Sequence, residues 1–428
     1  MTDAATQHAL RTCAADAPRA RHRCRFCGEP LADVFVDLGM SPLCESYLAA
    51  DELDRMEPFY PLCAYVCGNC LLVQLPQYVS AADIFSDYAY FSSYSDSWLR
   101  HARRYVAEMI ERFSLNGQSQ VVEIASNDGY LLQYFVARQI RVLGVDPAAN
   151  VAEVARAKGV PTVVRFFGRE TARELVEQGV RADLLVANNV LAHVPDLNDF
   201  VAGASALLAE GGVATFEFPH LLRLIDESQF DTIYHEHFCY FSFRTAVAVL
   251  AAHGLKVFDV QELSSHGGSL RVFARHAEER APPVSQRVAE LLEREAAAGL
   301  DRLETYRQFA ARVVETRHQL LQFLIDAKRQ GLAVAGYGAP GKGNTLLNYC
   351  GIRDDLLPYT VDRNPHKQGK FLPGTHVPIY APEKIAETRP DYVLILPWNL
   401  KEEISAQLAY IREWGGRFLI PIPEPTLF

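Results

Sequence analysis

The stretch VVEIASNDGYLLQYFVARQIRVLGVD, residues 121–146, decides the predicted fold of the central part of the chain. Its first five residues are rich in β-branched side chains and predict a strand, and the small polar residues Ser126–Gly129 predict a turn. A helix is expected over residues 130–138 and a second strand over VLGVD, residues 142–146. Strand, turn, helix and strand in this order are typical of an α/β domain with a parallel sheet.

The same alternation extends over most of the remaining chain. Further strands are predicted at DLLVANN (183–189) and GVATFEF (212–218), and a terminal strand pair at LKVFDVQEL (255–263) and SLRVFAR (269–275). A second α/β run is predicted at LAVAGYG (332–338), PYTVD (358–362), DYVLILP (391–397) and RFLIPIP (417–423). Helices are expected at 99–113 and at 284–330, the latter with a break near Gly299. The fold class is therefore α/β, with doubly wound parallel sheets.

Two Cys-x-x-Cys pairs, Cys24/Cys27 and Cys67/Cys70, lie before these α/β runs. Two pairs of thiolates supply the four ligands of a tetrahedral zinc site, and a closed four-thiolate site is structural because it leaves no position for substrate. The residues between the pairs must fold back as an element of their own. A redox Cys-x-x-Cys and unrelated core cysteines are the alternatives.

Composition limits the classes of partner. The chain has 428 residues and a net charge of −10, which argues against nucleic acid as the main partner. No apolar run approaches the length of a membrane span, so a cytoplasmic protein without a membrane partner is expected. The predicted domains are a zinc-binding domain at 21–77, a central domain at 78–280, and a helical linker with a second α/β domain at 281–428.

Two strand-to-helix turns compete for a nucleotide-like ligand. In EIASNDG (123–129), small residues let backbone N–H groups approach a ligand, and Asp146 ends the next strand, where a carboxylate accepts ribose hydroxyls. The second turn, GYGAPG (336–341), matches G-x-G-x-x-G, and Asp362 ends its following strand. Taken alone, this match favours NAD. Lys342 beside it suits the phosphates of a substrate equally well, and a tight turn without ligand stays open for both segments.

The densest cluster of reactive side chains is Tyr234-His235-Glu236-His237. Imidazole beside carboxylate is ordinary equipment for moving a proton near neutral pH. His193 follows a predicted strand end, where open α/β sheets build their sites. The segment SSHGGSLR (264–271) either lines the same pocket or forms a hairpin turn. Structural histidines and a His-x-His metal pair are the alternatives, the latter without a third ligand in the sequence.

Taken together, these motifs resemble one known family, the S-adenosylmethionine-dependent C-methyltransferases that act on nucleotide-linked 4-keto deoxysugars in antibiotic biosynthesis. The resemblance runs in order through the paired cysteines, VVEIASNDGYLL, GVDP, ANNVLAHVPD, DTIYHEHFCYFS, LSSHGGSLRVF, GYGAPGKGNTLLN and VDRNPHKQGKFLPGTHVPI. It implies a small N-terminal zinc-binding domain, a central class I (Rossmann-like) methyltransferase domain and a C-terminal Rossmann-like domain. Ala125 departs from the glycine common in the family and is expected to need only ordinary backbone angles.

The resemblance also implies which residues serve each ligand. The cofactor residues are Glu123, Ala125, Ser126, Asn127, Asp128, Gly129, Asp146, Pro147 and Asn189; the residues around the reacting sugar are Tyr88, His193, Tyr234, Glu236 and His237; those for the rest of a dTDP-linked 4-keto deoxysugar are His266, Gly338, Lys342, Asn344 and Asp362. The two small-ligand sites lie in different domains, so the reaction centre is expected in the cleft between them.

A carbon beside a ketone can lose its proton to a positioned base, and the resulting enolate can attack the methyl group of S-adenosylmethionine. His237, with a pKa near its unperturbed value, is the expected base, and Glu236 or Tyr234 would orient it or the sugar. His193 or Tyr88 would stabilise the enolate oxygen. An NAD-dependent oxidoreductase and a non-catalytic sugar-nucleotide binder are the alternatives. Ring position 3 or 5 is left open, and a monomer or weak homo-oligomer is expected.

Overall fold

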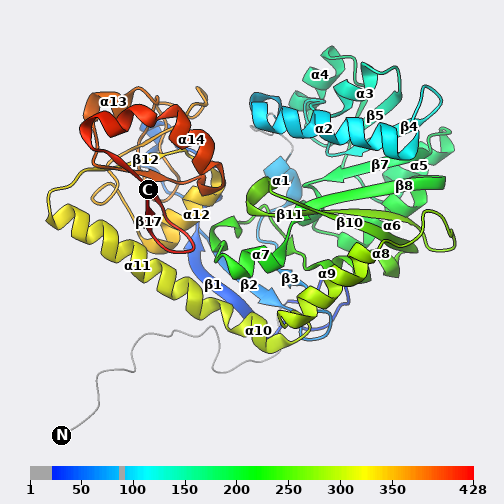
Figure 1. Ribbon diagram of the computed structural model, residues 1–428, viewed down its shortest axis with the longest axis horizontal. Helices are drawn as coiled ribbons and strands as arrows, with labels where there is room; N and C mark the ends of the chain where they lie inside the picture. The colour runs from blue at the N-terminus through cyan, green and yellow to red at the C-terminus, as the bar shows by residue number, and fades with distance from the viewer. Residues whose placement is uncertain (1–21, 86–91) are drawn as a thin grey trace, which may run out of the picture.

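The computed structural model describes residues 22–85 and 92–428 and contains three sheets (Figure 1). Tyr88 lies outside the described residues. A four-stranded sheet near the N-terminus lies between two α/β domains, the methyltransferase-like domain on one side and the C-terminal domain on the other (Figure 1). No described helix is long and apolar enough to cross a membrane.

The central domain is built on a seven-stranded sheet of order β10-β11-β8-β7-β4-β5-β6. Its strands are parallel except β11, which is antiparallel to its neighbours β10 and β8. The strands are β4 (Gln120–Ile124), β5 (Arg141–Asp146), β6 (Thr162–Val164), β7 (Ala182–Asn188), β8 (Leu208–Pro219), β10 (Leu255–Leu263) and β11 (Ser269–His276). The predicted terminal strand pair is thereby confirmed.

Helices cover both faces of this sheet, as a doubly wound fold requires. Because successive strand residues point to opposite faces, Val121 and Leu184 pack on the α2 and α3 side, whereas Val122 and Leu185 pack on the α6 and α8 side. The helices are α2 (Asp96–Phe113), α3 (Leu132–Val136), α4 (Ala149–Ala157), α5 (Arg169–Glu177), α6 (Leu197–Leu207), α7 (Leu221–Asp226) and α8 (Phe243–Ala252), with short 3-10 turns η3 (Leu191–His193), η4 (Phe230–Thr232) and η5 (Ser265–Gly267).

The C-terminal domain has a six-stranded sheet of order β14-β13-β12-β15-β16-β17. Only the edge strand β17 is antiparallel to its neighbour. Its elements are β12 (Val334–Tyr337), α12 (Gly341–Cys350), β13 (Thr360–Val361), β14 (Ile379–Tyr380), α13 (Lys384–Thr388), β15 (Tyr392–Ile395), η6 (Trp398–Leu400), α14 (Lys401–Gln407), η7 (Ala409–Trp414), β16 (Arg417–Ile420) and β17 (Thr426–Leu427). This is the second predicted α/β run.

The N-terminal sheet has the order β1-β2-β3-β9 and uses a strand from far along the chain. Its first strands are β1 (Asp33–Ser41), β2 (Tyr60–Val66) and β3 (Val73–Gln74), and they are accompanied by η1 (Ala50–Glu52), α1 (Ala81–Phe85) and the turn η2 (Ser92–Tyr94). The fourth strand, β9 (Cys239–Tyr240), comes from the central part of the chain and pairs with β3. The residues between the cysteine pairs therefore form the predicted separate element.

Three helices connect the two α/β domains: α9 (Gln286–Ala297), α10 (Leu303–Arg307) and α11 (Phe309–Arg329). The expected break is confirmed, since α9 ends before Gly299, whose φ is +82°. The long helix α11 runs from the N-terminal sheet to the C-terminal domain (Figure 1), and Phe309 on it stacks on Phe35 of β1 at 4.5 Å between ring centroids. The N-terminal sheet and the C-terminal domain therefore share one hydrophobic core.

Several predicted elements are shorter than expected, and two of them show the physical reason. The helix predicted over 130–138 covers only Leu132–Val136, because the chain turns after Ala137 and Gln139 adopts a φ of +59°. The strand predicted over 358–362 is reduced to Thr360–Val361. At its end Asp362 accepts the backbone N–H of Asn364, which starts a turn instead of continuing the ladder.

Candidate active site

The turn between β4 and β5 is held in a conformation that few residues adopt. Ala125, Asn127 and Gly129 have φ values of +58°, +48° and +75°. The expectation for Ala125 was therefore wrong: its Cβ is carried in the left-handed region, which costs a non-glycine residue roughly 1–2 kcal/mol. The conformation follows from the hydrogen bond of Ala125 N–H to Val145 O at 2.7 Å, which ties the turn to β5.

Asp146, at the end of β5, fixes this turn with both carboxylate oxygens. Its Oδ2 accepts the N–H of Asn127 at 2.8 Å and its Oδ1 the N–H of Ala148 at 2.9 Å. Pro147 lies between Asp146 and Ala148 at the same strand end. Asp128 accepts Lys158 Nζ at 3.0 Å, while the Ser126 side chain is fully buried against Gly144 of β5. The carboxylate of Asp146 thus lies at the strand end while Ser126 faces the sheet.

Several buried polar groups at these strand ends fit S-adenosylmethionine. Burial raises the pKa of the Glu123 carboxyl well above its usual range, although the Tyr130 hydroxyl opposes that shift. A ligand that carries an ammonium or sulfonium would supply the positive charge that this carboxyl lacks. The amides of Asn188 and Asn189, after β7, are buried and make no hydrogen bond with any described residue. Such groups are expected to find a ligand partner.

Aromatic side chains that the sequence reasoning missed connect this turn to the SSHGGSLR segment. Trp98 of α2 stacks on Tyr130 at 5.9 Å and on His101 at 4.7 Å, and meets His266 edge to face at 5.2 Å between ring centroids. The sequence signal was available, since Trp98 directly precedes the helix predicted at 99–113. His266, with a φ of +54°, is thus part of the turn between β10 and β11 and also packs against the aromatic side chains beside the 125–129 turn.

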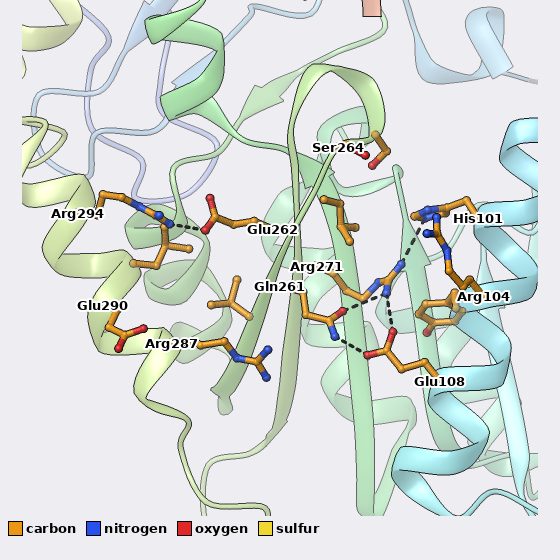
Figure 2. Close-up of a pocket in the computed structure, with 15 residues that line it drawn as sticks. His101, Arg104, Glu108, Gln261, Glu262, Ser264, Arg271, Arg287, Glu290 and Arg294 are labelled. Carbon is orange, nitrogen blue, oxygen red and sulfur yellow. Dashed lines mark hydrogen bonds and ion pairs between the residues drawn. The ribbon is translucent and has the colours of Figure 1, made fainter. Parts of the chain in front are cut away.

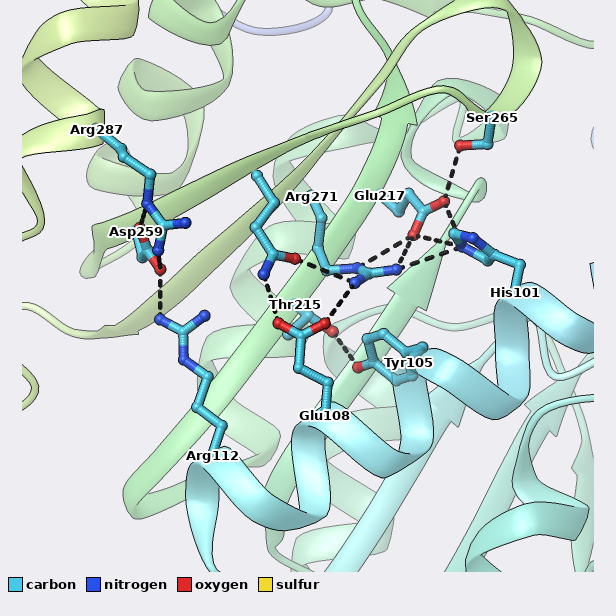
Figure 3. A network of polar contacts seen from close by, with 11 residues as sticks. His101, Tyr105, Glu108, Arg112, Thr215, Glu217, Asp259, Ser265, Arg271 and Arg287 are labelled. Atoms are coloured by element: carbon cyan, nitrogen blue, oxygen red, sulfur yellow. Dashed lines mark hydrogen bonds and ion pairs between the residues drawn. The ribbon is translucent and has the colours of Figure 1, made fainter.

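A buried ionic network reaches Ser265, the residue before His266 (Figure 3). Glu217 on β8 is inaccessible to solvent and accepts hydrogen bonds from Arg271 at 3.0 Å and Ser265 at 3.3 Å, and it contacts His101 at 3.0 Å. Burial acts to raise the pKa of Glu217, but the contact with His101 and the charge of Arg271 outweigh it and hold this pKa below its usual range. Because Ser265 precedes His266, the network anchors the turn that carries this histidine.

A cavity lies beside this network and is lined in part by its residues (Figure 2). It measures about 560 Å³ and lies between α2, α9 and the strands β10 and β11. Several of its polar groups contact each other: Arg294 pairs with Glu262 at 2.6 Å, and Arg271 donates to the amide oxygen of Gln261 at 3.1 Å. The histidines of the YHEH segment do not line it, so the site is built elsewhere.

Three of the predicted reactive side chains meet at one point. The ring centroid of His237 lies 4.6 Å from that of His193 and 4.1 Å from that of Tyr234. Nδ1 of His237 lies 2.8 Å from the carbonyl oxygen of Thr232, to which it donates, so Nε2 keeps its lone pair. His237 is thus oriented by a backbone carbonyl in the way expected of a general base.

The pKa of His237 is not near its usual value, contrary to expectation. Burial lowers it well below that value, and the neighbouring His193 adds to the effect. Burial also lowers the pKa of His193 to about 4. Both imidazoles are therefore neutral at physiological pH, and an anionic substrate beside them would raise their pKa values again.

Glu236 faces away from this pair of histidines. Its Oε1 lies 3.5 Å from Cys44 Sγ, and burial, followed by the charge of Glu45, raises its pKa to about 8. The contact that orients His237 comes instead from Thr232. His235 is also separate, since its ring lies against Pro61 O at 3.2 Å in the N-terminal sheet. Successive side chains of the YHEH segment thus contact different parts of the protein.

The C-terminal domain contributes Lys342 and Trp398 to the same centre. Lys342 Nζ lies 4.3 Å from the Trp398 ring centroid and donates to Asn399 at 2.9 Å. Trp398 in turn donates to the buried Asp231 at 2.7 Å and packs against Gly267. The charge of Lys342 contributes to the lowered pKa of His237. This cluster of side chains thus lies where the two α/β domains meet.

The glycine loop of the second predicted site is covered by the N-terminal domain. Asn344 donates to Cys44 O, Tyr47 donates to Ala339 O, and a Cβ on Gly341 would meet Cys44 Sγ at 2.8 Å. Asp362 accepts the N–H of Ala339 at 2.7 Å, and Gly338 has a φ of +90°. The loop side that would approach a pyrophosphate is filled with protein, which removes the ground for an NAD site.

The four predicted zinc ligands do converge. The sulfur atoms of Cys24, Cys27, Cys67 and Cys70 all lie within 4.8 Å of one another, with Cys24–Cys70 and Cys27–Cys67 separations of 3.5 Å. Zinc–sulfur bonds of about 2.3 Å in a tetrahedron place the sulfurs roughly 3.8 Å apart. Gln74 adds a donor to Cys24 Sγ at 3.2 Å. The donor set fits a structural zinc ion.

The strand order of the central sheet, its single antiparallel strand and the acidic residue that ends β5 define a class I S-adenosylmethionine-dependent methyltransferase domain. Three family models match in succession: a zinc binding domain at 24–85, a methyltransferase domain at 98–260 and a C-methyltransferase C-terminal domain at 264–423. The C-methyltransferase NovU of Streptomyces niveus is 39% identical over 413 residues, which cover 96% of this chain and 98% of NovU. The chain belongs to this C-methyltransferase family and is an S-adenosylmethionine-dependent C-methyltransferase with a zinc-binding domain.

Other similarities are confined to part of the chain. The ubiquinone biosynthesis O-methyltransferase of Methylobacterium sp. (strain 4-46) is 36% identical over 97 residues, 22% of this chain and 38% of that enzyme. Among solved structures, magnesium protoporphyrin IX methyltransferase from Synechocystis with bound S-adenosylmethionine is 14% identical with a TM-score of 0.32, covering 41% of this chain and 78% of that one.

Proposed function

We propose that this enzyme methylates a ring carbon next to the ketone of a dTDP-linked 4-keto deoxysugar, in deoxysugar or antibiotic biosynthesis. The observation that carries the proposal is the meeting of two neutral imidazoles, His193 and His237, with the ammonium of Lys342 between the two α/β domains. A base without charge and a nearby cation are what proton abstraction beside a carbonyl requires.

The first step is removal of a proton from the carbon beside the ketone. Nε2 of His237 accepts this proton, and the electron pair of the broken C–H bond moves onto the ketone oxygen to give an enolate. Thr232 O holds Nδ1–H and so keeps the imidazole in the tautomer that can accept at Nε2.

The enolate oxygen needs positive charge or hydrogen-bond donors. His193 lies next to His237, and Lys342 reaches the same centre from the C-terminal domain. We assign His193 to the enolate oxygen and Lys342 to a negatively charged part of the sugar nucleotide. Tyr88 stays a candidate for the enolate oxygen, outside the described residues.

S-adenosylmethionine, when bound, supplies an electrophilic methyl group for the enolate carbon. We propose that Glu123 and Asp146 hold its charged and ribose ends, with Asn189 and the 125–129 turn around them. The raised pKa of Glu123 and the unpartnered amide of Asn189 support this assignment. We also propose that the enzyme acts in a reducing compartment such as the cytoplasm and that it is a monomer or a weak homo-oligomer.

Incubation with S-adenosylmethionine and a panel of dTDP-4-keto deoxysugars, followed by mass spectrometry, tests the substrate. The expected product is one methylene unit heavier than the sugar nucleotide, and NMR of that product assigns the methyl group to C-3 or C-5. If no keto sugar nucleotide in the panel gains a methyl group while the enzyme binds S-adenosylhomocysteine, the proposed substrate class is wrong.

A further inference from the structure

One side chain of the zinc-binding domain contacts both segments that carry the two histidines. The residues it contacts lie one or two positions after each histidine in the sequence. We call the cluster of Cys24, Cys27, Cys67 and Cys70, with the two loops that carry it, the zinc knuckle. Arg25 lies between Cys24 and Cys27 in the sequence, and its side chain extends out of this knuckle. Its Nη1 donates to Pro195 O at 2.6 Å and its Nη2 to Leu75 O at 2.9 Å. Pro195 follows His193 by two residues, so the guanidinium holds the segment that carries this histidine.

The same guanidinium contacts the segment that carries the other histidine. Its central carbon lies 4.9 Å from the ring centroid of Phe238, the residue directly after His237. The backbone of Phe238 bridges the two segments, since its N–H donates to Ala192 O at 2.7 Å and its carbonyl accepts from Leu75 N–H at 3.0 Å. Arg25, Leu75 and Phe238 therefore form one contact that includes both histidine segments.

The zinc knuckle holds Arg25 firmly. Gln74 accepts the backbone N–H of Arg25 at 2.8 Å with one amide atom and donates to Cys24 Sγ at 3.2 Å with the other. From the methyltransferase side, Asn198 donates to Arg25 O at 3.1 Å and to Phe26 O at 2.9 Å. Cys24, Cys67 and Phe238 also belong to one hydrophobic cluster.

We infer that Arg25 is a positioning residue that uses the zinc knuckle to fix the distance between His193 and His237. A planar fork of donors suits this task because its two terminal nitrogens hold two carbonyls in a fixed relative geometry, whereas the single nitrogen of lysine ends a flexible stem and fixes no such geometry. This inference rests on the proposed function for the chemistry of the two histidines. The zinc-binding domain then acts on the reaction by geometry, without contact with substrate.

Arg25→Met tests this role because methionine keeps an unbranched apolar side chain at this position but removes the guanidinium, with both carbonyl contacts and the contact with the Phe238 ring. We expect one zinc per chain and unchanged S-adenosylhomocysteine affinity. The KM for the sugar nucleotide should change little, while kcat should fall by roughly 10- to 100-fold, the scale of an ångström-sized misplacement of reacting groups. Arg23→Met is the matched control and should leave kcat unchanged, since among the described residues the Arg23 guanidinium donates to Gly28 O, within the same cysteine loop.

Histidine-labelled NMR supplies a readout that is independent of turnover. In Arg25→Met the ring signals of His193 and His237 should shift while that of the distant His318 on α11 stays in place. If Arg25→Met loses zinc, Asn198→Ala replaces it, because Asn198 lies outside the knuckle. Wild-type kcat and unshifted histidine signals in the zinc-bound variant would overturn the inference. Shifted signals in an enzyme that methylates no keto sugar would instead overturn the proposed function and leave the positioning role standing.

Discussion

At the scale of single residues, strain gathers where the cofactor is proposed to bind. Ala125, Asn127 and Asn189 all have positive φ values, and all lie in the loops that follow β4 and β7. Asparagine tolerates this region better than alanine, because its short polar side chain bonds locally. Ala125 is therefore the costly member of the group, and the structure around it must supply the difference.

Ala125→Gly should raise the free energy of unfolding by about 0.5–1 kcal/mol. Glycine removes the left-handed strain, which costs alanine roughly 1–2 kcal/mol. Part of this gain is lost because glycine gives the unfolded chain more conformational entropy. Ala289→Gly, at an exposed position inside helix α9, is the control and should instead lose about 1 kcal/mol. Denaturant unfolding measures both. A destabilised Ala125→Gly variant would show that the side chain makes a contact worth more than the strain.

Glu236 makes stability depend on pH in a defined direction. Its pKa is about 8 in the folded protein against 4.5 in an unfolded chain, so the folded state holds a proton that unfolding releases between these values. Its contribution to stability is complete below about pH 4.5 and is lost as the pH rises to about 8. The buried histidines change stability in the opposite direction, but only below their ordinary pKa of 6.5.

Glu236→Gln should therefore flatten the fall in stability between pH 6.5 and 8, where the histidines no longer contribute. Chemical unfolding at several pH values in this window checks the slope, with Glu45→Gln as a control for the neighbouring carboxylate. An unchanged slope in Glu236→Gln would mean that Glu236 is ionised in the folded protein and that burial beside Glu45 does not keep it protonated.

At the scale of elements, local pattern predicted strands and turns better than their partners. The strands at 255–263 and 269–275 were confirmed as a pair because β-branched alternation reports local structure directly. The pairing of β3 with β9 could not be predicted, because the two strands are two residues each and lie more than 160 residues apart in the chain. The zinc cluster was predictable from spacing alone, since four thiolates have few other uses.

Cys70→Ser should lower zinc content to well below one ion per chain and lower the melting temperature, because metal binding at such a site is coupled to folding. Cys350→Ser is the matched control, since Cys350 is also buried but lies on α12, away from the cluster. Metal analysis and thermal unfolding follow both variants. Fully folded wild-type protein that contains no zinc would contradict the assignment.

At the scale of the whole molecule, the site is assembled from residues that the sequence keeps far apart. His193 and His237 come from the methyltransferase domain, Lys342 and Trp398 from the C-terminal domain, and the contacts of Arg25 from the zinc knuckle. The motifs could be recognised one by one in the sequence. The residues that each motif contacts in the folded protein could not be predicted. Glu236 and His237 are neighbours in the chain but contact different groups, and Cys44 contacts a loop some 300 residues away.

Lys342 should matter to sugar binding but not to the cofactor. Lys342→Ala removes a cation that lies beside the reaction centre, and we expect the KM for the dTDP-sugar to rise by about tenfold or more, the scale of a charge-assisted contact. S-adenosylhomocysteine affinity should stay constant in calorimetry. Lys384→Ala, which removes an exposed lysine of the same domain, is the control. Weaker S-adenosylhomocysteine binding would place Lys342 in the cofactor site instead.

The central claim is that His237 takes the proton that gives the enolate, and solvent-deuterium exchange without methyl donor tests it most directly. The wild-type enzyme should exchange the hydrogen on the carbon beside the ketone of a dTDP-4-keto sugar. His237→Asn should bind both ligands yet slow this exchange by roughly 100-fold or more, the usual scale of general-base loss. His235→Asn, two residues away and turned toward Pro61, should exchange at close to the wild-type rate. Exchange at the wild-type rate in His237→Asn would contradict the account and make His193 the base.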